Sequence, residues 1–114
     1  MAINSTRVAT EIVIDSAAAP VTSDPIEVID KDSSVSVLGT LGPCEIFIQL
    51  LGVPWSPTAI ADNDNWLSLI SYTTEHKLTA TNNAAGLINA GWYRFKMVGV
   101  PTTPVIVSVH YGKS

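Results

Sequence analysis

Apolar and polar residues alternate along much of the chain with a period of two, which is typical of β-strands that bury one face. In one clear example, Val105, Val107 and Val109 alternate with Ser108 and His110. Segments of this kind, bounded by glycine, proline, asparagine or serine, predict about eight strands: residues 6–15, 26–29, 34–39, 44–51, 66–72, 77–81, 92–98 and 105–111. We therefore expect an all-β fold, a single antiparallel β-sandwich, with a jelly-roll-like arrangement as one form of it.

Two segments interrupt the alternation. Residues 52–65 contain Pro54, Pro57 and a run of Asp and Asn, so they predict a long loop. Residues 82–89 are the one candidate for a short helical turn, which Gly86 and the neighbouring asparagines weaken. No helix longer than about two turns is expected.

The apolar faces of the strands predict the core. We expect it to include Val35, Val37, Ile46, Ile48, Leu67, Leu69, Tyr93, Phe95, Val107 and Val109. Trp66 and Ile70 alternate with Leu67 and Leu69, so only one of these two sets can point inward.

The beginning of the chain has two interpretations. Residues 1–23 form either a first strand or an arm, followed by a linker of small residues, and residues 24–114 form the sandwich domain. As an arm, the segment would add a strand to the sheet edge of a neighbouring subunit. The contacts of such an arm would come from its apolar residues: Ile3, Val8, Ile12 and Ile14.

Composition supports the all-β interpretation, since 34 of the 114 residues are Val, Ile or Thr. The net charge is −4, and six cationic residues are scattered among ten acidic ones, so we expect no nucleic-acid partner. The single cysteine, Cys44, excludes an intramolecular disulfide. Thr10 and Glu11 interrupt the first apolar stretch, so we expect no secretion signal, and no segment has the apolar length of a membrane span.

No catalytic or metal-binding pattern emerges from the residues. Asp62 and Asp64 have the spacing that opens a calcium loop, but Leu67 and Thr73 occupy the positions that require Gly and Glu, so a turn before Trp66 is expected instead. Cys44, His76 and His110 are isolated, with too few ligands for a structural metal. We expect a protein that is not an enzyme and has no cofactor.

Exposed tryptophans are the best candidates for contact residues. Val53 and Trp55 lie in a loop stiffened by two prolines, where Trp55 is either an anchor for a partner or a cap on the open end of the sandwich. Trp92 shares its face with Arg94 and Lys96, which places it outward or at a sheet edge, where it could stack on a sugar or a subunit.

A family resemblance rests on residues 35–39 (VSVLG), 46–50 (IFIQL), 66–69 (WLSL), 78–81 (LTAT), 90–95 (AGWYRF) and 105–109 (VIVSV). These segments resemble small β-sandwich accessory virion proteins of tailed bacteriophages. The resemblance implies a non-enzymatic capsid decoration (cement) protein or a tail-associated protein. The resemblance also implies that the partners are other virion proteins and that the chain forms a homo-oligomer, with a trimer favoured. The protein would be made in the host cytoplasm and located in the virion.

The alternative is a carbohydrate-binding or adhesin-like module. A sugar binder should expose an aromatic side chain beside Asp, Asn or Gln, whereas a protein that binds a lattice should expose apolar residues in several places.

Overall fold

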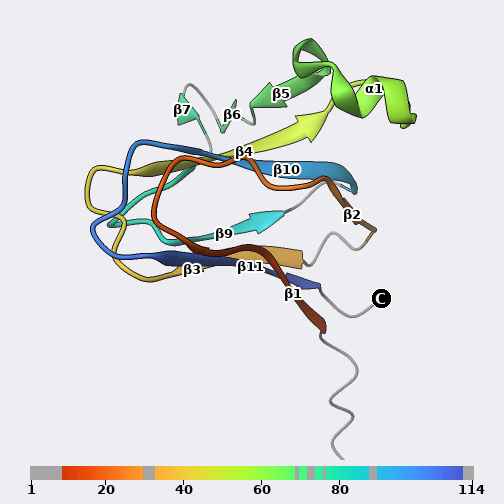
Figure 1. The fold of residues 1–114 in the computed structure, drawn as a ribbon. Coiled ribbons are helices and arrows are strands. Elements are labelled where there is room, and N and C mark those ends of the chain that lie inside the picture. The colour runs from red at the N-terminus through yellow and green to blue at the C-terminus, as the bar shows by residue number, and fades with distance from the viewer. Residues whose placement is uncertain are drawn as a thin grey trace, which may run out of the picture.

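Two antiparallel β-sheets stack face to face over one apolar core (Figure 1). The computed structural model describes residues 9–29, 33–68, 70–71, 74–75, 77–87 and 90–111. One sheet has the strand order β1-β11-β3-β9, and the other has the order β2-β10-β4-β5, with β8 also paired to β4. The strands are β1 (Ala9–Ala17), β2 (Ile26–Val28), β3 (Ser33–Leu38), β4 (Glu45–Leu51), β5 (Trp66–Ser68), β6 (Ile70–Ser71), β7 (Thr74–Glu75), β8 (Lys77–Leu78), β9 (Ala84–Leu87), β10 (Gly91–Val98) and β11 (Val105–Tyr111). The expected all-β sandwich is confirmed.

The strand pairs are nested from the outside of the chain inward. β1 pairs with β11, β2 with β10, β3 with β9, and β4 with both β5 and β8. This is the pairing of one long hairpin that has been rolled into two sheets, which is the jelly-roll arrangement. The chain therefore crosses between the sheets at most of its connections.

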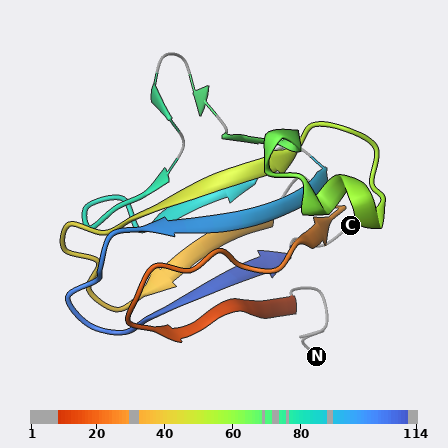
Figure 2. The same cartoon turned by 45° about the horizontal axis from the view of Figure 1, so that its top comes forward.

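The two strands expected between residues 66 and 81 are shorter than the alternation predicted. β5 pairs with the end of β4 and β8 with its beginning, while β6 and β7 pair with each other and stand away from the sandwich (Figure 2). β8 ends at Leu78 because Thr79 and Asn82 bond to each other through their backbones, which turns the chain. The expected continuous strands over residues 66–72 and 77–81 are thus wrong in their extent.

The core contains most of the residues expected in it. Its fully buried side chains include Val35, Ile46, Ile48, Tyr93, Phe95, Val107 and Val109, and Val37 is buried as well. Leu67 was expected in the core but is 56% exposed, whereas Trp66 is buried. The reason is that the face of β5 carrying Trp66 is covered by the segment before it, whose backbone accepts the Trp66 indole N–H. Leu69 lies outside the described residues.

β1 lies at a sheet edge and has two irregularities in its pairing with β11. The register shifts between Ile12 and Ile14 and again between Ile14 and Ala17, and Ser16 has a φ of 54°. Such bulges turn following side chains to the opposite face of the strand. Ile12 is therefore 53% exposed and Ile14 only 4%, although the alternation placed both on one face.

Two short helices occupy the segment that was expected to be a loop. They are α1 (Pro57–Ala61) and the 3-10 helix η2 (Asn63–Asn65). α1 begins with Pro57 after Ser56, whose hydroxyl accepts the Ala59 backbone N–H at 2.9 Å. Asp62 accepts the Asp64 N–H at 2.9 Å, which confirms the turn expected before Trp66. Neither helix in the described part of the chain has the length or apolar character needed to cross a bilayer.

The one candidate for a short helical turn, within residues 82–89, contains a strand instead. Ala84–Leu87 forms β9, which pairs with β3 at the edge of the first sheet. Leu87 is fully buried, so tertiary pairing and burial decide the conformation of this segment rather than its local sequence.

Candidate functional site

The loops that join β3 to β4 and β10 to β11 lie side by side at one end of the sandwich, at the left of Figure 1. The Thr40 carbonyl accepts the backbone N–H groups of Thr102 and Thr103 at 3.0 and 3.2 Å, and the Thr103 hydroxyl accepts the Thr40 N–H at 2.9 Å. Gly39 has a φ of 117°, and a Cβ there would lie 2.7 Å from the Pro104 carbonyl oxygen. This position therefore requires glycine, and the two loops form one rigid unit.

We call this surface the loop end and define it as residues 38–43 and 98–104. It contains no Asp, Glu, Lys or Arg, and it exposes the apolar residues Leu38 (72% exposed), Val98 and Val100. A rigid, uncharged, apolar surface loses little entropy and desolvates little charge when a partner covers it. Sequence reasoning missed this surface because it treated the glycines and prolines only as strand boundaries. The signal that could have revealed it is the presence of apolar residues in two turns that contain no charged residue.

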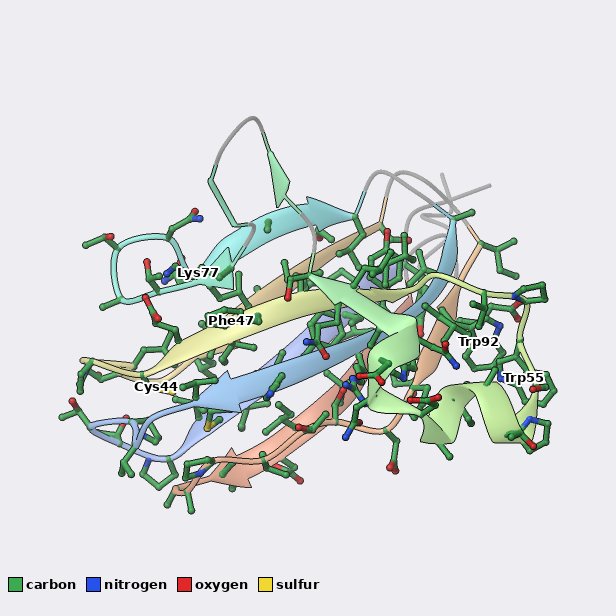
Figure 3. The ribbon with its side chains drawn as sticks, turned by 90° about the horizontal axis from the view of Figure 1, so that it is seen from above. Cys44, Phe47, Trp55, Lys77 and Trp92 are labelled. Atoms are coloured by element: carbon green, nitrogen blue, oxygen red, sulfur yellow. The ribbon has the colours of Figure 1, made fainter. Side chains whose placement is uncertain are left out.

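Trp55 stacks on Trp92 at the other end of the molecule. Their ring centroids are 5.4 Å apart, and the ring planes differ by 27° (Figure 3). Trp55 is 48% exposed, and Trp92 lies on the outer face of β10. Trp55 had two alternatives, an exposed anchor for a partner or a cap on the open end of the sandwich. In the structure the ring packs on the outer face of a sheet, and the residue is about half exposed, so the arrangement lies between the two. Val53 is exposed in the same loop.

Arg94, two residues after Trp92 on β10, binds the loop that carries Trp55. Its guanidinium carbon lies 4.8 Å from the centroid of the Trp66 ring. Its Nε donates to Gln49 Oε1 at 2.7 Å, and its Nη1 donates to Asn63 Oδ1 at 3.1 Å. Burial lowers the pKa of Arg94 below its ordinary value, but the group stays charged at neutral pH. We call Trp55, Trp66, Trp92 and Arg94 the tryptophan corner.

The outer face of the same sheet also carries two lysines. Lys96 lies opposite Phe47 in the register of β10 and β4, and the Lys77 Nζ lies 5.4 Å from the centroid of the Phe47 ring. Lys77 also pairs with Glu45 at 2.8 Å. The fold therefore gathers Lys77, Arg94 and Lys96 on one face, although they are scattered in the sequence. Cross-strand pairing between β4, β8 and β10 produces this grouping, and no local pattern signals it.

His110 is not isolated in the fold. Its Nε2 lies 2.8 Å from the Ser36 hydroxyl, and its Nδ1 lies 3.1 Å from the Thr10 hydroxyl. The order of a hydroxyl, an imidazole and a third group resembles that of a hydrolase triad, but the third group is a neutral threonine that cannot stabilise an imidazolium as a carboxylate does. We assign these contacts a structural role, since they connect β1, β11 and β3 across the outer face of the sheet.

Cys44 is buried at the beginning of β4. Burial, followed by the charge of Glu45, raises the pKa of its thiol above the ordinary value of 9.0. A protonated, buried thiol is a weak nucleophile, and the side chain packs in the hydrophobic core. Within the described residues, no three or more His, Cys, Asp or Glu side chains come together as a metal site would require.

The sequence-predicted contact residues are thus dispersed. Trp55 and Trp92 meet, with Val53 in the adjoining loop, whereas Ile12 lies on β1 and Ile14 in the core. Ile14 was expected to contact a neighbour, and its burial excludes this. Ile3 and Val8 lie outside the described residues. No protein-family model matches the chain, and searches of curated proteins and of solved structures give no match either.

Proposed function

We propose that the chain is a non-enzymatic structural protein of a phage particle, which binds the capsid lattice as a decoration protein. The observation that carries this proposal is the loop end, where Leu38, Val98 and Val100 are exposed on two loops held together by Thr40 and Thr103. A lattice of repeated subunits offers many identical, shape-complementary positions for such a preorganised surface.

The distribution of the other exposed apolar residues supports a partner of large area. Large exposed apolar side chains also occur away from the loop end, as in Ile12 and Ile29. This agrees with the expectation that a lattice-binding protein exposes apolar residues in several places. Jelly rolls occur in viral capsid proteins and also in lectins, so the fold by itself is only an analogy.

The N-terminal arm is part of the proposal in a shorter form. Residues 9–17 are β1, which pairs with β11 of its own chain, so an arm that contacts neighbours would consist of residues 1–8 with Ile3 and Val8. Ile12 would add an exposed contact on the edge strand. We propose that the chain assembles as a homo-oligomer, with a trimer as the favoured form.

The proposal is tested with particles of the phage that encodes the chain. We expect the chain in gradient-purified particles at a fixed ratio to the major capsid protein, and gold-labelled antibodies on the heads. Particles from a deletion strain should rebind the purified chain in a saturable manner. Labelling of tails instead would assign the chain to the tail and contradict a capsid decoration protein, and absence from the particles would refute the proposal altogether.

Substitutions test the loop end itself. Leu38→Asp and Val100→Asp should each weaken binding to the deletion-strain particles at least tenfold, because they place a charge in an apolar contact. Leu67→Asp is the matched control, since Leu67 is similarly exposed but lies on β5, outside the loop end. It should bind within about twofold of the wild type. Equal binding by all three variants would exclude the loop end as the contact surface.

A further inference from the structure

The tryptophan corner combines an open aromatic surface with a rigid support. One face of Trp55 is covered by Trp92, and the residue as a whole is 48% exposed. Its loop is fixed by Pro54, by the Ser56 cap of α1 and by the hydrogen bond from the Gly52 N–H to the Asn65 carbonyl at 2.8 Å. A fixed aromatic ring binds the C–H face of a sugar with little loss of conformational entropy.

Arg94 adds an oriented positive charge to this surface. A guanidinium has five N–H donors, of which one on Nε and one on Nη1 are bonded to Gln49 and Asn63. Both acceptors are neutral, and among the described residues no carboxylate forms an ion pair with Arg94. The remaining donors and the uncompensated charge suit a carboxylate, which guanidinium groups bind in a bidentate manner.

The aromatic pair and the guanidinium lie on the same outer face of the sheet. Trp92 and Arg94 are two residues apart on β10, so their Cα atoms are about 7 Å apart along the strand. An acidic sugar, in which a carboxylate is attached directly to a ring with an apolar C–H face, combines the two chemical features that this surface suits. We propose that the tryptophan corner binds an acidic sugar, a hexuronate, with its ring on the exposed surface of Trp55, which Trp92 supports, and its carboxylate on Arg94.

Glu27 determines which way such a ligand would lie. It is exposed and stands opposite Trp92 in the register of β2 and β10. The Arg94 guanidinium points to the other side of β10, toward Gln49 on β4 and Trp66 on β5. The Glu27 carboxylate would accept hydrogen bonds from ring hydroxyls and repel the acid group, which leaves Arg94 as its binding partner.

This inference does not depend on the lattice proposal, because the tryptophan corner and the loop end share no residue. Figure 3 shows Trp55 and Trp92 at one end of the sandwich and Cys44, which adjoins the loop end in the chain, toward the other end. A failure of either experiment therefore leaves the other proposal unaffected.

The test titrates the full chain with uronate trisaccharides of galacturonate, glucuronate and mannuronate and with their methyl esters, which keep the ring but lose the charge. Binding is followed by tryptophan fluorescence and by the indole N–H resonances in nuclear magnetic resonance spectra. We expect at least one acid to bind at least tenfold more tightly than its ester, with affinity that falls as salt is added. No binding by any acid, or equal binding of acids and esters, would overturn the proposal.

Variants separate the roles of the residues. Trp55→Ala should weaken binding of the acid at least tenfold, and Arg94→Gln should reduce it to the level of the ester. Asn63→Ala removes one tie of the loop but keeps the charge, so the ratio of acid to ester affinity should persist. Lys96→Gln, which removes a charge two residues further along β10, should change affinity less than twofold. Retention of the acid preference in Arg94→Gln would refute the role of Arg94.

Discussion

Tyr111 and Glu11 bond across the pair β1–β11, where the Tyr111 hydroxyl donates to Glu11 Oε1 at 3.1 Å. Burial, followed by the hydrogen bond and the charge of Glu11, raises the pKa of Tyr111 from 10.0 to about 12. The folded state therefore holds this proton more tightly than the unfolded state does. The stabilisation is fully present below pH 10 and is lost as the pH rises through about 12.

The phenolate absorbance of the wild type should accordingly include a tyrosine that titrates near pH 12 and is missing in Tyr111→Phe. Glu11→Gln should lower the pKa of Tyr111 but leave it above the ordinary value, because burial is the largest cause. If the tyrosine that disappears in Tyr111→Phe titrates near pH 10 in the wild type, the burial of its ring is contradicted.

Phe95 tests the core at the same scale. Its side chain is fully buried between the sheets, so Phe95→Ala should lower the free energy of unfolding by about 3–5 kcal/mol. Leu38→Ala, at a mostly exposed position, should change it by no more than about 0.5 kcal/mol. Urea unfolding measures both values. Similar losses in the two variants would mean that the assigned faces of the strands are reversed.

Single-residue burial could be predicted where a strand faces the opposite sheet, as for Val35 or Phe95. It could not be predicted for Leu67 and Trp66, because the covering material is the α1–η2 segment and not a sheet. The alternation shows that the two faces of β5 differ. It carries no information about which face a distant loop will cover.

Among the elements, β1 departs most from its sequence pattern. A period of two assumes an unbroken ladder, and the bulges after Ile12 and Ile14 each add a residue to one strand only. Such irregularities protect an edge strand from pairing with other chains. They depend on the register with β11, so residues 9–17 alone could not reveal them.

A short and a long deletion at the N-terminus should therefore have different effects on stability. A chain that begins after Val8 keeps β1 and should show the wild-type circular dichroism spectrum and unfolding midpoint. A chain that begins after Ala19 loses the burial of Ile14 and one of the two strands that pair with β11, and should unfold at a clearly lower urea concentration. An unchanged midpoint in the longer deletion would show that β1 is dispensable.

At the scale of the whole molecule, the fold class follows from alternation and β-branched residues, but the tryptophan corner does not. Trp55 and Trp92 come from a loop and a strand that meet only because α1 and η2 pack on the outer face of the sheet. Arg94, Gln49 and Asn63 likewise come from three different segments. The sequence predicts Trp55 and Trp92 as candidates, and the sheet topology determines which residues become their neighbours.

The nested pairing has a consequence for how the chain acquires its structure over time. Glu11 and Tyr111, which bond in the folded state, are 100 residues apart in the chain. During synthesis β1 has to wait for β11 as its partner, and β2 for β10. One sheet is therefore complete only after β11, the last strand, has left the ribosome, and the other only after β10 has done so. Distant pairing of this kind makes folding slow, since loop closure comes before the contacts that offset its entropic cost. Until the sheets are complete, the edges of the unpaired strands are vulnerable to aggregation. The yield of folded protein in the cell should therefore depend on the folding rate as well as on the final stability.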